Sequence, residues 1–175
     1  MDPFQTLVSI AQRSQKVAQE LPSMEDTQAH WMGLGFRLHV NLFVVPLGEV
    51  LEMMQVPHTT YLPGVKNWVA GVANVRGRLM TLIDFALFFG QGSKRSKAQS
   101  RIFVVEGEDT YYGLIVDESL GMQHFSTDSR TEEVVGVDER YLPYVDSCFH
   151  AAGIQWPVMS LAAVAQRIRS ESLTI

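Results

Sequence analysis

The chain has 175 residues, of which 46% are hydrophobic and 19% charged, and its formal net charge is −5. This length suffices for one domain or two small lobes with a buried core, and the negative charge argues against nucleic acid as a partner. No stretch approaches the roughly 20 apolar residues that span a bilayer, and the first residues do not form a secretory signal. We therefore expect a cytoplasmic protein without direct membrane insertion, and the lone Cys148 fits a reducing compartment.

Residues 1–30 predict an N-terminal helical extension and a connector. Within Phe4–Leu21 the apolar positions fall near one helical face, at Phe4, Leu7, Val8, Ala11, Ala18 and Leu21. Pro3 and Pro22 match the two ends of such a helix. The helix either packs back on the domain or serves as a partner-binding arm, and residues 22–30 are a polar connector.

From Trp31 the pattern changes to short β-like runs. Strands are predicted over Gly35–Val40 and Leu42–Val45, with a turn near Asn41, and then over Val50–Val56. Two prolines in residues 57–64 exclude a central strand there. A short helical turn over Val65–Ala70 is expected to follow.

The stretch from Gly71 to Gly90 predicts a hairpin with one guanidinium at its tip. Val72–Val75 and Leu79–Ile83 read as the two strands, and too few residues separate them for any other connection. Gly77 can take the positive φ that the reversal requires. Arg76 lies at the turn, where an arginine is most often a solvated surface charge.

The second half repeats this β-rich pattern. The polar, basic residues Gln91–Arg101 read as a linker between two lobes, and Ile102–Val105 and Tyr111–Val116 predict a second hairpin. Residues 42–49 weakly resemble residues 111–118. Met159–Arg169 should form a closing helix, with its apolar positions at Leu161, Val164, Ala165 and Ile168. Short strands without a βαβ rhythm indicate an all-β fold with short helices, built from barrels.

Candidate chemistry is sparse. Cys148 and His150 lie two residues apart, but no feature of the sequence marks a cleft beside them, and the five histidines lack metal-ligand spacing. We therefore predict no enzyme, no cofactor and no metal site. The alternative from another class is a small-ligand β-barrel sensor, whose pocket would be framed by acidic hairpin tips at Glu106, Glu108, Asp109, Asp117 and Glu118.

One set of residues carries a resemblance to a known family. The hairpin signature consists of Gly71, Val72, Asn74, Arg76, Gly77, Ile83 and Asp84. It resembles the signature of CheW-like domains, the adaptor modules of bacterial chemotaxis systems, and the resemblance covers about Trp31 to Ala165. It implies a CheW-like domain over residues 31–175 with two small five-stranded β-barrel lobes, the first at about 31–92 and the second at about 102–160. The closing helix would span about 159–169.

The resemblance also implies a binding site. In such adaptors the arginine that matches Arg76 contacts the cytoplasmic tip of a methyl-accepting chemoreceptor. Val50-Leu51-Glu52-Met53 matches the family strand that supplies apolar and acidic groups. We expect Val50, Met53 and Val72 to line a furrow with Arg76 and Glu52 at its rim. Gly71 lies beside this site, and Asn74, Gly77 and Asp84 shape the hairpin.

The second implied partner is the regulatory domain of a CheA-type histidine kinase, held at a barrel end. The extension before Trp31 and the residues Trp31–Phe36 are similar to adaptors of pilus-control chemosensory systems, which implies a role in type IV pilus twitching motility. It also implies recruitment to the inner-membrane face through a receptor array. After Ile83-Asp84 the family usually continues Leu-Arg, whereas this chain has Phe85-Ala86. A fragment of the kinase's own regulatory domain is a second alternative, and it would need flanking phosphotransfer or ATP-binding sequence.

Overall fold

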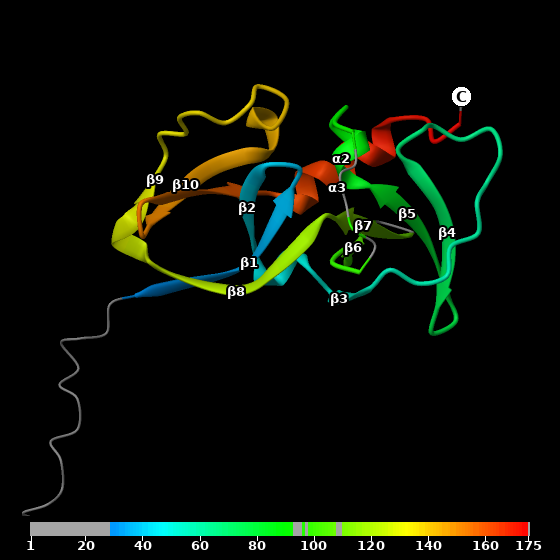
Figure 1. Cartoon of the computed structure of the whole chain (residues 1–175), viewed down its shortest axis with the longest axis horizontal. Coiled ribbons are helices and arrows are strands. Elements are labelled where there is room, and N and C mark those ends of the chain that lie inside the picture. The colour runs from blue at the N-terminus through cyan, green and yellow to red at the C-terminus, as the bar shows by residue number, and fades with distance from the viewer. Residues whose placement is uncertain (1–28, 93–95, 97, 108–109, 175) are drawn as a thin grey trace, which may run out of the picture.

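The computed structural model of the chain describes residues 29–92, 96, 98–107 and 110–174. The strands form two β-sheets, to which the chain adds a few short helical segments (Figure 1). The predicted helix over Phe4–Leu21 lies outside the described residues. The fold is therefore all-β with a few short helices, as the sequence indicates.

Each sheet contains strands from both halves of the chain. The first sheet has the order β8-β1-β2-β11-β10-β9, with β1 (His30–Leu38), β2 (Asn41–Pro46), β8 (Glu118–Ser126), β9 (Arg130–Thr131), β10 (Val145–Ala151) and β11 (Ile154–Met159). The second has the order β3-β6-β7-β5-β4, with β3 (Glu52–Gln55), β4 (Val69–Val75), β5 (Arg78–Asp84), β6 (Arg101–Glu106) and β7 (Tyr111–Val116). The helical segments are α2 (Phe85–Phe88), α3 (Leu161–Ser170) and the 3₁₀ turns η2 (Leu47–Glu49), η3 (Thr127–Ser129) and η4 (Leu142–Tyr144). One sheet thus has six strands instead of the expected five, because the two-residue β9 extends it.

The two sheets exchange strands. β1 and β2 pair in the first sheet, and the next strand, β3, pairs with β6 in the second. In the same way β6 and β7 pair in the second sheet, and β8 then returns to pair with β1. The weak internal resemblance reflects this arrangement, because residues 42–49 cover most of β2 and residues 111–118 cover β7.

This exchange corrects the predicted division into lobes. Assigning residues 31–92 to one lobe and 102–160 to the other is wrong, because β6 and β7 follow the basic linker yet lie in the sheet of β3, β4 and β5. A polar stretch marks an exposed connection, but it does not reveal which strands pair across it.

Some of the individual strands and turns predicted from the sequence form as expected, and others do not. The β4–β5 and β6–β7 hairpins form as predicted. The first turn lies at His39-Val40, and Asn41 already begins β2. The predicted helical turn over Val65–Ala70 is wrong, since Val65 instead forms an isolated bridge to Thr174 and β4 begins at Val69. β3 is shorter than predicted, with four residues.

Three groups of buried apolar side chains hold the structure together. The largest lies between the sheets and combines side chains of β1, β2, β6 and β7 with the helices α2 and α3. Two smaller clusters lie on the opposite faces of the second and first sheets. The run Ile102–Val105 is buried along its whole length because β6 contributes to both a central and an outer cluster.

Helix α3 closes the central core as predicted. Its buried residues are the four whose spacing indicated a helix: Leu161, Val164, Ala165 and Ile168. At its start the Ser160 hydroxyl accepts a hydrogen bond from the Ala163 amide (3.3 Å), and the Glu49 carboxylate accepts from the Leu161 and Ala162 amides. These acceptors satisfy amide groups that an α-helix leaves unpaired at its N-terminus.

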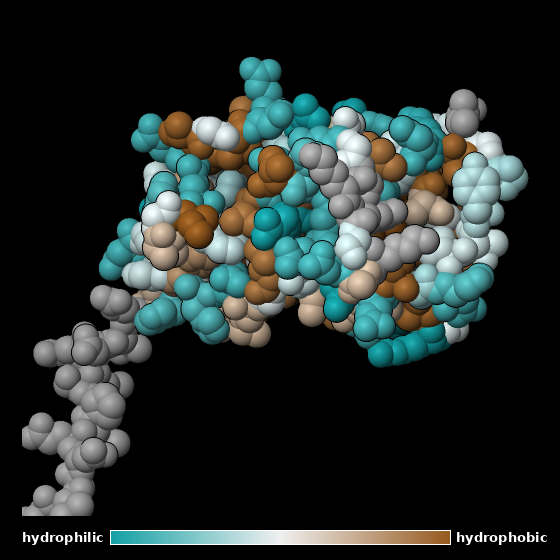
Figure 2. All heavy atoms as spheres, viewed as in Figure 1, coloured by the Kyte–Doolittle hydropathy of each residue, from teal (hydrophilic) through white to brown (hydrophobic). Residues whose placement is uncertain are grey.

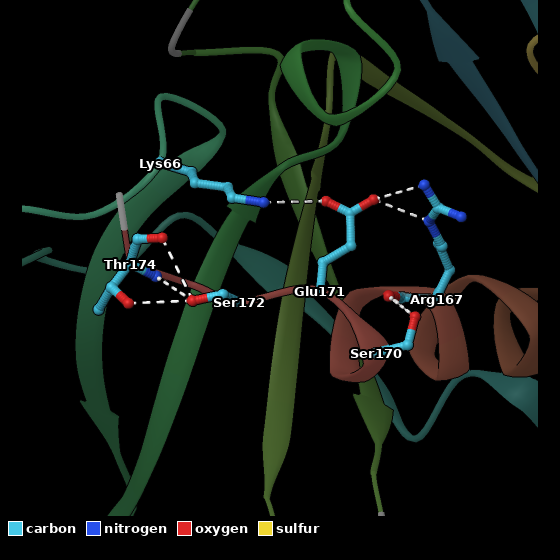
Figure 3. A network of polar contacts seen from close by, with 6 residues as sticks. All are labelled: Lys66, Arg167, Ser170, Glu171, Ser172 and Thr174. Atoms are coloured by element: carbon cyan, nitrogen blue, oxygen red, sulfur yellow. Dashed lines mark hydrogen bonds and ion pairs between the residues drawn. The ribbon is translucent and has the colours of Figure 1, made fainter.

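The other end of α3 is tied to the loop before β4. The Glu171 carboxylate lies between Lys66 Nζ (3.3 Å) and the Arg167 guanidinium (2.7 Å), as Figure 3 shows. Burial alone would raise the pKa of Glu171, but the hydrogen bonds from Arg167 and Lys66 outweigh it and lower the pKa below its usual value. The ionised carboxylate therefore stabilises the C-terminal contact.

Candidate partner-binding site

The β4–β5 turn holds Arg76 in a fixed position. Val75 pairs with Arg78, so Arg76 and Gly77 alone form the turn, and both have positive φ, 52° and 81°. This is the geometry of a type I′ turn, which matches the right-handed twist of the flanking strands. The Asn74 side-chain oxygen accepts a hydrogen bond from the Gly77 amide at 2.9 Å. Asn74 and Gly77 thus shape the turn, while Arg76 itself adopts a conformation that its residue type disfavours.

The second sheet curls until its two end strands approach each other. β3 and β4 lie at opposite ends of the strand order, yet Thr60, which follows β3, forms a bridge to Val72 of β4. At the hairpin tip the Arg76 guanidinium pairs with the Glu52 carboxylate through two contacts, of 2.8 Å and 3.0 Å. The Arg76 side chain is 76% exposed and that of Glu52 34%. The arginine is thus oriented by an ion pair but remains open to solvent.

A groove of about 380 Å³ opens beside this ion pair. Apolar and aromatic side chains form most of its wall, and charged groups lie at its rim; the lining residues are Leu51, Glu52, Met54, Val75, Arg76, Arg78, Met80, Val104 and Tyr111. Figure 2 shows strongly hydrophilic side chains beside hydrophobic ones at the end of the molecule where Figure 1 has the β4–β5 turn. The site can therefore accept an apolar side chain and pair an acidic group next to it.

Arg78 is a second cation at the groove that the sequence did not single out. Its guanidinium lies over the Tyr111 ring, 4.9 Å from the ring centre. Register brings the two together, because β5 and β7 pair in parallel and Met80 lies opposite Tyr111. The alternation of side chains along β5 could have indicated this position of Arg78, since Arg78 and Met80 are two residues apart and therefore share a face of the strand.

The other predicted site residues do not line this groove. Val50 packs against the central core, and the side chain of Met53 lies on the opposite face of β3 from Glu52, where its sulfur accepts a hydrogen bond from the Ser119 hydroxyl at 3.0 Å. Val72 is half-buried in the bridge to Thr60. Val50, Met53 and Val72 therefore do not line this groove, and the furrow expected from them stays a prediction. Met53 faces away from Glu52 because neighbouring residues of a strand point to opposite faces.

Gly71 is required where the segment after β3 approaches β4 closely. Its φ is 137°, and a Cβ atom built on it would lie 2.3 Å from the Thr60 carbonyl oxygen. Glycine thus permits the close approach of the segment after β3 to β4. Asp84 lies away from the turn, at the end of β5, where its carboxylate accepts a hydrogen bond from the Leu87 amide (3.1 Å) and caps α2.

Other candidate centres are separated or occupied by structural contacts. Cys148 is buried, which raises the pKa of its thiol, whereas His150 on the same strand is exposed. Asp117 accepts a hydrogen bond from the His39 amide, and Glu118 pairs with Arg37 at 3.0 Å. Within the described residues no three His, Cys, Asp or Glu side chains gather as a metal site would require. None of the helices that the structure describes is long and apolar enough to cross a membrane.

Comparisons with known proteins show the family and the fold of the chain. The family model of the CheW-like domain matches residues 32–169. Protein PilI of Pseudomonas aeruginosa is 44% identical over 164 residues, which cover 94% of this chain and 92% of that protein. The chemotaxis protein CheW of Helicobacter pylori is 29% identical over 103 residues, covering 59% of this chain and 62% of that one. The crystal structure of the scaffolding protein TtCheW from Thermoanaerobacter tengcongensis shares the fold, with a TM-score of 0.64 at 24% identity over 74% of this chain and 88% of that one.

Proposed function

The chain belongs to the CheW-like domain family of chemosensory adaptors, and from this we propose that it couples methyl-accepting chemoreceptors to a CheA-type histidine kinase without catalysing a reaction. The match to PilI along nearly the whole chain carries the proposal and supports a role in type IV pilus twitching motility. The protein would work in the cytoplasm, at the inner-membrane face, where receptors recruit it. Family membership does not favour a small-ligand sensor.

The receptor tip is proposed to lie along the free edge of β3. There it would meet Arg76 and Glu52 on one side of the strand and Met53 on the other. Val50, Gly71 and Val72 would act by shaping this edge, since they support β3 and β4 from behind. A helical tip buries its apolar stripe in such a groove, and one guanidinium fixes its register against a carboxylate or carbonyl.

The kinase regulatory domain is proposed to bind a separate surface at a barrel end. Each contact needs only a modest area, on the order of 1,000 Å² in total, as is usual for transient signalling assemblies. Kinase activity would then depend on the orientation in which the adaptor holds both partners.

A cellular experiment tests this function. The untagged protein is purified from cells with its bound chains, which are identified by mass spectrometry, and a strain that lacks the gene is complemented with wild type or Arg76→Ala. We expect a receptor and a CheA-type kinase to co-purify with wild type, the receptor to be depleted from the variant, and twitching to be lost with the variant. Co-purification of neither partner would contradict the proposal.

A further inference from the structure

Three exposed methionines lie on strands β1, β3 and β8. Met32 of β1 is 47% exposed, Met53 of β3 44% and Met122 of β8 54%. Leu34 lies opposite Met122 in the β1–β8 ladder, so Met32, two residues before Leu34, shares a face with Met122. Ser119, also on β8, contacts the Met53 sulfur at 3.0 Å. We call Met32, Met53 and Met122 the methionine stripe.

The stripe extends the central core outward onto the surface. Its face of β1 continues into Leu34 and Phe36, which are buried between the sheets. The opposite face of the same two strands is already filled, because Trp31, Leu120 and Phe125 pack in the core of the first sheet. Flexible thioether side chains adapt to different apolar surfaces. Half-exposed methionines on one face therefore suit a helix with an apolar stripe.

The chain's own N-terminal segment lies within reach of this stripe. β1 begins at His30, two residues before Met32. The connector from residue 22 to residue 29 can span at most roughly 25–30 Å, so residues 4–21 cannot move far from the stripe. A short tether of this kind gives an effective concentration in the millimolar range, on the order of 1 mM. As a helix these residues would be roughly 27 Å long, with six apolar side chains near one face.

The comparison with PilI points to this segment independently. That match covers 164 residues, more than the 147 that residues 29–175 can supply, so it reaches well into the first 28. The family model begins only at residue 32. At least part of the segment is thus shared with a relative in which the methionine-bearing strands also align, although the family domain does not include it.

We propose that residues 4–21 form a helix that docks on the methionine stripe of the same chain through Phe4, Leu7 and Val8. The docking itself does not depend on the proposed function. One consequence of the docking rests on the proposed function. Because Met53 belongs both to the methionine stripe and to the proposed receptor site, the docked segment would compete with a receptor tip and lower the apparent affinity for the receptor.

Photo-crosslinking in the full-length protein tests the docking. A benzophenone side chain is placed at position 122, and at position 79 as a matched control, because Leu79 is also exposed (65%) but lies on the β4–β5 hairpin. Wild-type copies labelled with ¹⁵N are mixed in so that mass spectrometry separates links within one copy from links between copies. We expect position 122 to link to residues 4–21 of the same copy and position 79 not to. Absence of that link, equal links from both positions, or links only between copies would overturn the proposal.

Methionine methyl NMR of the full-length protein gives a second readout. Leu7→Asp should shift the Met32 and Met122 methyl signals, while Met80 and Met159, which are buried, stay in place. Ser9→Asp adds the same charge on the opposite helical face and should shift neither. Identical spectra for the two variants would contradict docking.

Receptor titration separates the two proposals. If both hold, Leu7→Asp should bind a soluble receptor tip several-fold more tightly than wild type. If no variant binds a receptor tip while the crosslink forms, the proposed function fails and the docking stands. If receptor binds wild type and Leu7→Asp equally and position 122 forms no link, the docking fails and the proposed function stands.

Discussion

Replacing Arg76 by alanine should weaken receptor binding while leaving the domain folded. In the free protein the ion pair between Arg76 and Glu52 is short but exposed to solvent, since the Arg76 side chain is 76% exposed. Two unit charges 2.8 Å apart attract each other by roughly 1.5 kcal/mol in water. Ordering two long side chains offsets most of this, and exposed pairs contribute about 0.2–1 kcal/mol. The free energy of unfolding should therefore fall by less than about 1 kcal/mol, as measured by urea denaturation.

The effect on binding should be larger. At an interface the guanidinium would meet an acidic or carbonyl group of the receptor tip in a partly dry groove, and its removal would leave both that group and Glu52 without a partner. Such central contacts cost about 1–3 kcal/mol when truncated, which corresponds to a roughly 5- to 150-fold higher Kd. Isothermal titration calorimetry with a soluble receptor-tip fragment measures this difference directly.

Arg78→Ala is the matched control. Arg78 is a second exposed arginine at the same groove, but its guanidinium lies over the Tyr111 ring instead of pairing with Glu52. We expect its Kd to change by less than about threefold, since a cation–π contact at an exposed site contributes about 0.5–1 kcal/mol to the free protein. If folded Arg76→Ala binds as wild type, or if both variants weaken binding equally, the assignment of Arg76 as the register-fixing contact is refuted.

Three further changes test contacts that support the site. Gly71→Asp should lower the free energy of unfolding by more than about 2 kcal/mol in urea titrations, because its Cβ would collide with the Thr60 carbonyl; a stability equal to wild type would refute this reading. Glu49→Gln should cost about 1 kcal/mol by weakening the amide contacts at the start of α3, and Glu139→Gln on an exposed loop serves as its control. Glu171→Gln should flatten the acid limb of the stability curve: the folded pKa is lowered, so its stabilisation of about 0.5–1 kcal/mol is full above pH 4.5 and disappears as pH falls through the folded pKa. Parallel curves for wild type and variant below pH 4.5 would contradict that assignment.

Sequence patterns located the elements whose contacts are local. The β4–β5 hairpin follows from two apolar runs around Gly77, and the buried face of α3 follows from helical spacing. Both patterns can be recognised within one short stretch of sequence, although α3 also packs against distant strands. The helical turn predicted over Val65–Ala70 failed because a long-range bridge from Val65 to Thr174 decides its conformation.

The candidate site was predictable only in part for the same reason. Arg76 and Glu52 were singled out, and the structure pairs them, although 24 residues separate them in the chain. The groove wall was missed because it depends on which face of β3 turns toward the hairpin, and on the register that sets Tyr111 beside β5. A one-residue change of register would have exchanged these faces, and no local pattern fixes it.

The exchange of strands between the sheets bears on how such an adaptor could transmit a signal. β2 belongs to the first sheet and β3 to the second, while β7 belongs to the second and β8 to the first. Two chain crossings, together with the apolar face of α3 packed in the core between the sheets, oppose a hinge between the two sheets. A partner held on the β3 edge is therefore fixed in orientation relative to both sheets, and a second partner at a barrel end is fixed relative to the first. Under the proposed function the adaptor need not change shape itself, because a rotation of the receptor tip on β3 would be passed on as a rotation of the whole rigid body against the kinase.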